Sequence, residues 1–402
     1  MCTLRMSTAG ESHGAAELCL LEGVPAGLAL DDEYIDKELA RRTVGYGRGG
    51  RMAIERDKAR ILAGVRLGRT LGSPIAIAVD NRDHVNWLSV MAVEALSGEA
   101  EGQIAPVTVP RPGHADYAGA MKYGHRDLRN VLERASARET VARVAGGAVC
   151  KRLLEEVGVA VRGRVVRIGP VSATGEERVS PDDIDWAAVE ASDVACDDPV
   201  AAEAMRKAID EARAAGESLG GVFEIWCWGV CPGVGGYATP EERLDALLLW
   251  ALGSIPGIKG VEIGAGFAQA ALPGSLVHDP FCLVENARGR FITRRSNRAG
   301  GLEGGVTNGM PLVLRAAMKP IPTLTSPLDS VDLASLKPTK AHVERSDIAA
   351  VPAARVVGEA MVAYVLARAY LAKFGGDSMD ELVRSVNAYE GRLEERGLWR
   401  RS

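Results

Sequence analysis

Two histidines lie in short segments of small and polar residues, and proton transfer is the chemistry that their side chains offer. His13 is part of Thr-Ala-Gly-Glu-Ser-His-Gly at 8–14, and His114 is part of Arg-Pro-Gly-His-Ala-Asp-Tyr at 111–117. Such compositions predict shaped loops rather than helix or strand interiors. Because histidine titrates nearest neutrality, both are candidate acid–base groups. A structural histidine bonded to the backbone is the alternative, which the charged neighbours disfavour.

The remaining histidines and the cysteines do not suggest a metal or a disulfide framework. Three histidines lack a comparable setting, and a fourth, His125, stays open; the three are His84, His278 and His342. No His-x-x-x-His or His-Glu-x-x-His spacing occurs, so no metal site is predicted. The seven cysteines are odd in number and include no Cys-x-x-Cys, which is typical of a reducing, cytoplasmic protein.

Arginine is concentrated in a few segments of an acidic chain. The formal net charge is −5, yet eight arginines fall between Arg41 and Arg69, and five fall between 287 and 299. A planar guanidinium binds carboxylate or phosphate in a bidentate manner. This distribution predicts a small polyanionic ligand, whereas the overall charge argues against nucleic acid as a partner.

The glycines of 45–50 match the Gly-x-Gly-x-x-Gly spacing of dinucleotide-binding loops. An arginine-rich, helix-like segment precedes them and no strand-to-helix turn is evident, so a Rossmann role is disfavoured. Glycine allows a ligand to approach the backbone closely, and Arg42, Arg48 and Arg51 surround these glycines. A solvated basic loop is the alternative, and at this point the two interpretations are even.

Residues 133–139 are expected to open a long helix. Successive polar groups that include Ser136 favour an anion at a helix N-terminus. Arg134 and Arg138 are four residues apart and would share a face, where they repel unless an anion or carboxylates lie between them. Pairing of one arginine with a glutamate of the same segment is the alternative.

Three segments of the C-terminal half also have the composition of ligand-binding loops. Residues 297–309 include five glycines, which bring a backbone close to a ligand. Residues 318–323 read Met-Lys-Pro-Ile-Pro-Thr, a stiff turn whose lysine and hydroxyl suit a phosphate. Arg345 and Asp347 precede a long apolar helix. A surface ion pair is the alternative for these two residues.

Strands and helices interleave without regular βαβ units, which predicts a mixed α+β architecture with antiparallel pairs and one domain. Residues 18–21 and 26–30 are predicted to form a hairpin. Other predicted strands are 61–65, 75–79, 159–168, 222–230 and 310–316. Predicted helices are 32–42, 132–156, 199–215, 240–252, 352–374 and 378–396. The pair Gly146-Gly147 inside the second helix predicts close approach of another backbone.

No charged and apolar leader is evident at the N-terminus, which predicts no signal peptide. No run of 18 apolar residues occurs, which predicts no membrane partner.

Taken together, these segments resemble the chorismate synthase family, of the monofunctional type. The matching stretches occur in family order and span most of the chain: 9–14, 45–51, 111–116, 133–139, 260–264, 297–309, 318–323 and 344–347. The resemblance implies a layered β/α/β sandwich with antiparallel sheets that assembles as a homotetramer. It also implies a single domain over 1–402, in which helix 378–396 and the tail 397–402 are peripheral.

The resemblance implies a lyase of the shikimate pathway to aromatic amino acids. Its substrate would be 5-enolpyruvylshikimate 3-phosphate, which loses phosphate from C3 and a hydrogen from C6 in an anti 1,4-elimination that gives chorismate. Reduced FMN is required, although the reaction has no net redox change. A flavin reductase that uses NADP chemistry would supply the reduced FMN. A substrate with two carboxylates and a phosphate would explain the clustered arginines.

The resemblance also assigns roles to individual positions. His13 corresponds to the acid that protonates the leaving phosphate, His114 to the histidine near reduced flavin, and Asp347 to the carboxylate near flavin N5. The implied substrate-binding residues are Arg42, Arg48, Arg51, Arg111, Ser136, Arg138 and Arg345. The implied cofactor-binding residues are Arg134, Ala135, Ser136, Pro256, Gly257, Gly304, Met318, Lys319, Pro320, Ile321, Pro322, Thr323 and Arg345.

The chain departs from the family at Pro256-Gly257, where other members often have Asn-Ala or Gln-Ala. Only backbone contacts to flavin are then expected there. Two rival functions are a nonenzymatic polyanion-binding module and an NAD-dependent dehydrogenase. The aromatic content of 5% weighs against the first, because single-strand binders use aromatic stacking platforms.

Overall fold

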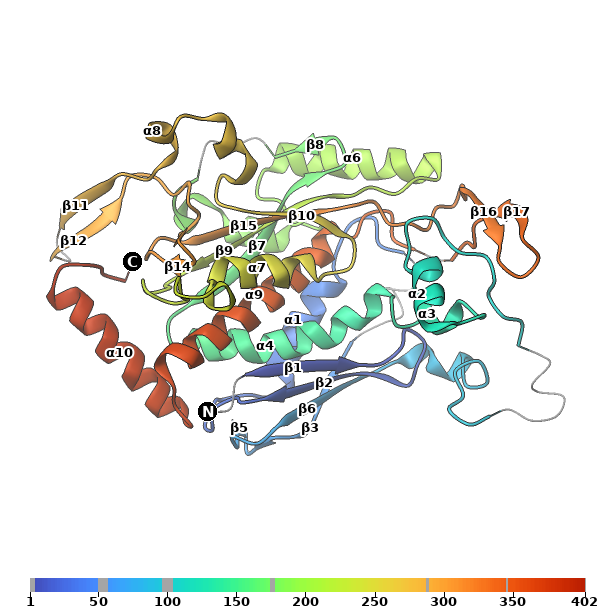
Figure 1. Cartoon of the computed structure of the whole chain (residues 1–402), viewed down its shortest axis with the longest axis horizontal. Coiled ribbons are helices and arrows are strands. Elements are labelled where there is room, and N and C mark those ends of the chain that lie inside the picture. The colour runs from blue at the N-terminus through green and yellow to red at the C-terminus, as the bar shows by residue number, and fades with distance from the viewer. Residues whose placement is uncertain are drawn as a thin grey trace.

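The protein is a three-layered sandwich in which helices separate two antiparallel sheets (Figure 1). The computed structural model describes residues 4–49, 57–95, 104–173, 178–286, 289–344 and 346–401. The first sheet has the order β1-β2-β6-β3 and comprises β1 (Arg5–Ala9), β2 (Ala16–Glu22), β6 (Ile75–Asp80) and β3 (Ala59–Ala63). The second has the order β10-β15-β9-β7-β8 and comprises β10 (Ile258–Ile263), β15 (Leu312–Met318), β9 (Gly221–Trp228), β7 (Ala160–Ile168) and β8 (Val171–Ser172). The α+β sandwich predicted from the sequence is confirmed.

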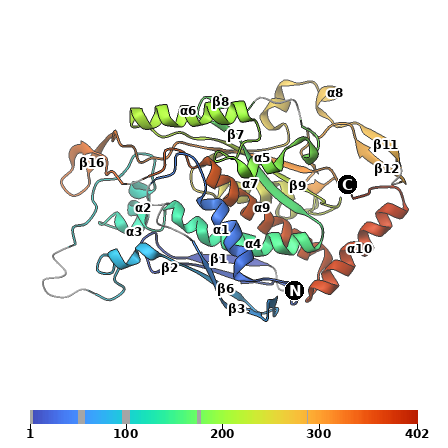
Figure 2. The same cartoon turned by 180° about the vertical axis from the view of Figure 1, so that it is seen from behind.

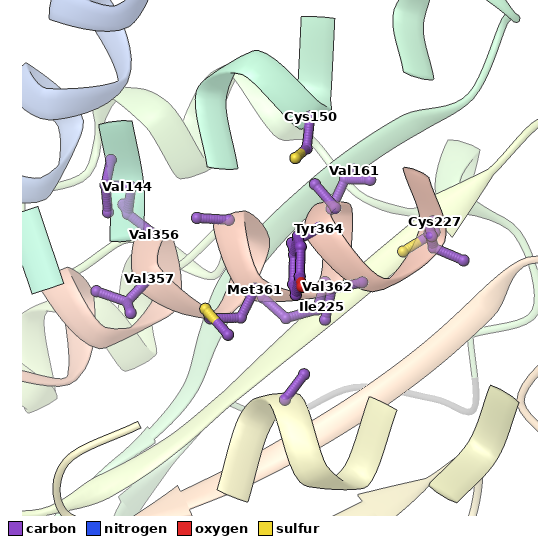
Figure 3. Close-up of a cluster of buried hydrophobic side chains, with 14 of the residues drawn as sticks. Val144, Cys150, Val161, Ile225, Cys227, Val356, Val357, Met361, Val362 and Tyr364 are labelled. Carbon is purple, nitrogen blue, oxygen red and sulfur yellow. The ribbon is translucent and has the colours of Figure 1, made fainter. Parts of the chain in front are cut away.

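The middle layer consists of helices. It contains α1 (Asp32–Thr43), α4 (Thr140–Glu156) and α9 (Val351–Phe374), and α7 (Leu244–Gly253) packs on α9 and β10. Helices α4 and α9 are mostly buried, and α1 buries one face. Helix α9 buries side chains on every face, which is the expected position of a helix that is apolar all round. Figure 3 shows Val144 and Cys150 of α4 close to α9, whose Val357 and Met361 lie in the same apolar cluster.

The remaining elements lie around this core. The other helices are α2 (Asp116–Tyr123), α3 (Arg129–Leu132), α5 (Trp186–Ala191), α6 (Pro199–Ala215), α8 (Gly274–Val277) and α10 (Met379–Glu395). The two-stranded ribbons are β4 (Val65–Arg66) with β5 (Arg69–Thr70), β11 (Phe281–Asn286) with β12 (Gly289–Arg294), β13 (Leu302–Glu303) with β14 (Val306–Thr307), and β16 (Asp329–Asp332) with β17 (Lys337–Lys340). Helices α2 and α3 lie at one end of the sandwich in both views (Figures 1 and 2). Among the described residues, we find no helix that is both long and apolar enough to cross a membrane.

The predicted hairpin of 18–21 with 26–30 is wrong. Strand β2 pairs instead with β1 and β6, and β1 was not anticipated. Residues 26–30 bond to the region of β5, because the Gly27 amide donates to Thr70 O and the Leu30 amide donates to Gly68 O. Partners more than thirty residues away in the chain therefore outcompete the local turn.

The long helix predicted from residue 132 begins later. Ser136 caps a single 3-10 turn at Ala137–Glu139, and α4 starts at Thr140. The backbone of the preceding segment is used elsewhere, since Glu133 O accepts from the Ser12 amide at 3.0 Å. Similarly, 240–252 divides into the turn Pro240–Glu242 and α7, and Thr239 makes no side-chain cap.

The glycine pair of α4 lies where the helix is pressed from two sides, as predicted. A Cβ at Gly147 would lie 2.5 Å from Ala360 Cα of α9, and one at Gly146 would lie 2.6 Å from Cys19 Sγ of β2. We expect Gly147→Val to destabilise the protein by about 1–3 kcal/mol, or more, because the opposing atoms are backbone. Urea unfolding would measure this, with Gly253→Ala as the control, since a Cβ there meets no atom within 4 Å. An unchanged midpoint for Gly147→Val would contradict the close packing.

Candidate active site

His13 lies in the loop that joins β1 to β2, where the register ends at the pair Ala9 and Leu18. Its Nδ1 is 2.9 Å from Glu133 Oε1, and its backbone amide donates to Glu133 Oε2 at 2.8 Å. The ring stacks on Trp87 with 3.8 Å between the ring centroids. Asn81 holds the loop itself by donating to Ser12 O at 2.8 Å. These contacts fix the ring plane of the histidine.

Glu133 is a buried carboxylate whose charge the histidine stabilises. Only 3% of its side chain is exposed, and Arg129 Nη1 lies 3.5 Å from its Oε1. Burial alone would raise the pKa of Glu133, but the hydrogen bonds and charge of His13 outweigh burial, and the pKa falls below its ordinary value. The carboxylate also fixes Nδ1 as the ring nitrogen that is engaged on this side. An acid held in this way can deliver a proton from Nε2.

His114 lies in the second predicted loop, beside a buried ion pair. Its Nδ1 is 2.5 Å from Asp116 Oδ1, at the start of α2. Arg111 donates through Nε to Asp116 Oδ2 at 2.9 Å and through Nη1 to Glu344 Oε2 at 3.1 Å. Burial raises the pKa of Asp116, but hydrogen bonds from His114 and Arg111 lower it more, so it lies well below the ordinary range. Asp116 is therefore a carboxylate that orients both neighbours.

Two of the predicted substrate-binding arginines share one acid. Arg138 Nη1 donates to Asp57 Oδ1 at 2.6 Å, and Arg42 Nη1 lies 3.5 Å from Asp57 Oδ2. Arg42 also donates to Thr140 Oγ1 at 3.1 Å and to Ala137 O at 3.0 Å. Both arginine side chains are about 5% exposed. The pair forms a preorganised cationic wall around Asp57.

A third arginine bonds to the third predicted catalytic residue. Arg48 Nη1 lies 2.9 Å from Asp347 Oδ2, and the Gly49 amide donates to Asp347 Oδ1 at 2.7 Å. The predicted glycine loop and the predicted 344–347 segment are thus in direct contact. Two further predicted residues, Arg51 and Arg345, lie outside the described residues.

These groups form two hydrogen-bonded networks, which the chain joins between Arg42 and Arg48. Ser136 Oγ lies 3.2 Å from Ser12 Oγ, which links the His13 loop to the turn that carries Arg138. At the other side, Ser346 Oγ donates to Thr323 O at 3.1 Å. Arg111 Nη1 reaches Thr323 Oγ1 at 3.4 Å, and so the network continues to His114. The two histidines therefore belong to one region of the molecule, together with those predicted arginines that the structure describes.

The predicted cofactor-binding residues divide into two places. The Lys319 ammonium bonds to Gly113 O beside His114, and the Lys319 amide donates to Gly257 O at 2.9 Å. Of the predicted residues of this group, Lys319, Pro322 and Thr323 lie against the His114 loop. Gly257 packs on Met318 and accepts from the Lys319 amide, and Pro256, Pro320 and Ile321 are the chain neighbours of these residues. Arg134, Ala135 and Ser136 border the His13 loop, where Arg134 Nη2 donates to Thr8 Oγ1 at 2.8 Å.

Gly304 lies apart from this region within the chain. It follows β13, and the amide of Leu244, the first residue of α7, donates to the adjacent Gly305 O. Gly257 lies beyond the other end of α7. The helix has 10 residues, and at 1.5 Å of rise per residue its two ends are roughly 15 Å apart. Within one subunit, Gly304 therefore lies about the length of α7 away from the other residues that are predicted to contact flavin.

Sequence reasoning missed the acids that organise the site. Asp57 and Asp116 lie in segments that were interpreted from their basic residues. Glu133 was interpreted only as a possible partner of an arginine in the same helix. Trp87 lies in a region of weak resemblance. A signal was present for Asp116, because an acid two residues after a loop histidine is a common orienting partner. No group of three or more His, Cys, Asp or Glu is placed to hold a metal ion within the described part of the chain.

The fold brings together histidines, carboxylates and arginines that could carry out acid–base chemistry on an anionic ligand. Comparisons with known proteins all identify the same family. The model described as chorismate synthase matches residues 4–371. A chorismate synthase of Desulforudis audaxviator is 57% identical over 390 residues, which cover 97% of this chain and 98% of that protein. A chorismate synthase of Geobacillus kaustophilus is 54% identical over 383 residues, with 95% and 97% covered.

A crystal structure of a chorismate synthase superposes on this fold with a TM-score of 0.78 at 41% identity, covering 98% of this chain and 99% of that one. This chain belongs to the chorismate synthase family. The resemblance drawn from the sequence motifs is confirmed.

Proposed function

We propose that this protein converts 5-enolpyruvylshikimate 3-phosphate into chorismate as a lyase. In the anti 1,4-elimination, the C3–O bond breaks as phosphate leaves, and the C6–H bond breaks to complete the diene. The observation that carries the proposal is a pair of hydrogen-bonded networks, one that joins the His13 loop to Arg138 and one that joins Arg48 through the 346–347 segment to Arg111 and His114. They join acid–base groups to cations within a chain of this family.

His13 is the proposed acid for the leaving phosphate. Its Nδ1 is engaged by Glu133 at 2.9 Å, so Nε2 remains as the proton-donating atom. The paired cations Arg42 and Arg138 would hold substrate anions, as would Arg48 with its partner Asp347. Each charge-assisted hydrogen bond contributes roughly 1.5–3 kcal/mol. Positioning and charge are therefore the contributions of this side of the site.

The residues around His114 fit reduced FMN. The pKa of Lys319 is lowered by burial and by the nearby charge of Lys259, and two cations of this kind suit a flavin phosphate. Arg134, with 42% of its side chain exposed, can also reach a ligand. Reduced FMN held by these residues would supply the electron density that departure of the phosphate needs, with no net redox change. His114, held by Asp116 at 2.5 Å, would lie beside it.

The decisive experiment is an anaerobic incubation with reduced FMN and 5-enolpyruvylshikimate 3-phosphate. We expect phosphate and chorismate to appear together in equal amounts, followed by a phosphate assay and by the absorbance of chorismate. Omission of reduced FMN should abolish both products. Folded, flavin-bound protein that releases neither product would refute the proposed reaction.

We further propose a single-domain subunit in a cytoplasmic homotetramer that receives reduced FMN from a separate reductase. One feature supports assembly. Hairpin β11–β12 stands away from the sandwich (Figure 1), and its Phe281 and Leu283 are 67% and 48% exposed. A two-stranded hairpin is marginally stable alone, so its apolar side chains are expected to be covered by another subunit.

A further inference from the structure

Glu17 is a buried carboxyl at a position where the fold otherwise places apolar side chains. Strand β2 alternates between the two faces of its sheet, and Glu17 shares the inner face with Cys19 and Leu21. The residue is 1% exposed, and neither carboxyl oxygen has a hydrogen-bond partner among the described residues. An unsatisfied buried carboxyl is rare in native proteins and indicates a functional or strained group.

The nearest cation is the guanidinium of Arg134. Arg134 Nη1 lies 3.9 Å from Glu17 Oε2, which is an ion-pair distance but beyond a hydrogen bond. The same guanidinium donates to Gly10 O at 3.2 Å and to Thr8 O at 3.2 Å, at the start of the His13 loop. Since 42% of the Arg134 side chain is exposed, it reaches from this buried carboxyl to the surface.

Gly10 lets the carboxyl lie directly against the loop. A Cβ at this position would be 2.5 Å from Glu17 Oε2, and the backbone has φ of +131°. A side chain here would therefore push Glu17 away from the loop that carries His13. Glu17 therefore packs directly against the backbone of this loop, in addition to its ion pair with Arg134.

The charges that surround Glu17 oppose one another. Burial raises the pKa of Glu17 to about 7. Arg134 and Arg138 lower it, whereas Glu139 and Glu11 raise it further. The carboxyl thus gains and loses its proton in the range where the protein would work.

We propose that Glu17 is a positioning residue of the active site, which draws Arg134 inward when charged and releases it to the flavin when neutral. The inference rests on the proposed function, in which Arg134 contacts FMN. A charged Glu17 at 3.9 Å competes with an anionic ligand for the same guanidinium. Flavin binding should therefore weaken as Glu17 loses its proton.

The test compares binding of oxidised FMN at pH 5.5 to 8.5 in the wild type, Glu17→Gln and Glu22→Gln, measured by quenching of flavin fluorescence. Glu22 is the other glutamate of β2, at the far end of the strand, and serves as the matched control. We expect Kd of the wild type relative to Glu17→Gln to rise about fivefold across this range, the low end of couplings between sites. The Glu22→Gln profile should follow the wild type. Titration of the FMN phosphate is common to all three proteins and cancels in the ratio.

Parallel profiles for the wild type and Glu17→Gln would overturn the role of Glu17 and leave the proposed function intact. Absence of flavin binding in the wild type at every pH would overturn the proposed function together with this inference. If Glu17→Gln fails to fold, as judged by circular dichroism, Glu17→Leu replaces it, because the neighbours on the inner face of β2 are apolar. A Kd that rises with pH as steeply without the carboxyl as in the wild type refutes the proposal in either variant.

Discussion

Substitution of His13 by alanine is expected to lower kcat by about 10²–10⁴-fold, the usual contribution of a general acid. The imidazole is the proposed proton donor for the leaving phosphate, and Glu133 at 2.9 Å keeps it oriented. Removal of the ring leaves the loop intact, because Asn81 still holds Ser12 O. The loss should therefore fall on kcat rather than on folding. Phosphate release under anaerobic conditions measures it.

Two further substitutions separate the role of the acid from other causes. His114→Ala should show a loss of similar order, since His114 would stand beside the flavin. His278→Ala should behave as wild type, because this exposed histidine follows α8 and lies outside the network. Near-normal turnover in His13→Ala, with His278→Ala also normal, would show that another group protonates the phosphate.

The second large effect concerns stability, and we expect Glu359→Ala to cost about 3–5 kcal/mol. Glu359 of α9 has no exposed surface and accepts from Arg41 at 2.7 Å, from Lys151 at 2.8 Å and from the Gly163 amide at 2.9 Å. The alanine variant leaves these buried cations without their common carboxylate. The free energy of unfolding in urea, or the soluble yield if the variant does not fold, measures the effect.

The Glu359 carboxyl also predicts how the stability of the protein depends on pH. Burial alone would raise the pKa of Glu359, but the charges of Arg41 and Lys151 outweigh it and hold the pKa well below its ordinary value of 4.5. A lowered folded-state pKa means that the stabilisation is fully present above pH 4.5 and is lost as the pH falls below it. Glu359→Gln should lack this acid-induced loss.

Glu285 provides the matched control. Its pair with Arg290 has a similar distance of 3.0 Å, but the two side chains are 66% and 70% exposed. Exposed ion pairs contribute little because solvent and salt screen them. Glu285→Ala should therefore leave the unfolding midpoint nearly unchanged. Equal effects of the two substitutions would contradict the importance of burial.

Local patterns predicted many of the elements correctly. Helix α6 spans the residues 199–215 that its amphipathic spacing predicts, and α10 begins directly after Ser378, where a helix is predicted. Both depend on residues within a few positions of one another. The failures are of another kind. The hairpin at 18–30 and the uninterrupted helix from 132 were lost to partners distant in the chain, such as Thr70 for Gly27 and Ser12 for Glu133.

The candidate site shows the same division. The loops that carry His13, His114 and Arg48 could be identified from the sequence, because their glycine, proline and charged residues are incompatible with regular secondary structure. Their pairing could not, because Glu133 is 120 positions from His13 and Asp347 is 298 positions from Gly49. Burial of Glu17 was equally invisible, since the alternation of β2 becomes evident only when β1 and β6 flank it.

The sequence by itself therefore determined the family, the interleaved α+β pattern and the loops that hold the reactive side chains, because these depend on residue types and short spacings. Only the tertiary structure decided which acid faces each arginine and histidine, where α4 starts and which carboxyl is buried. The reason is physical: the strength of a charged pair and the pKa of a carboxyl depend on distance and on exclusion of water. Packing between segments far apart in the chain sets both.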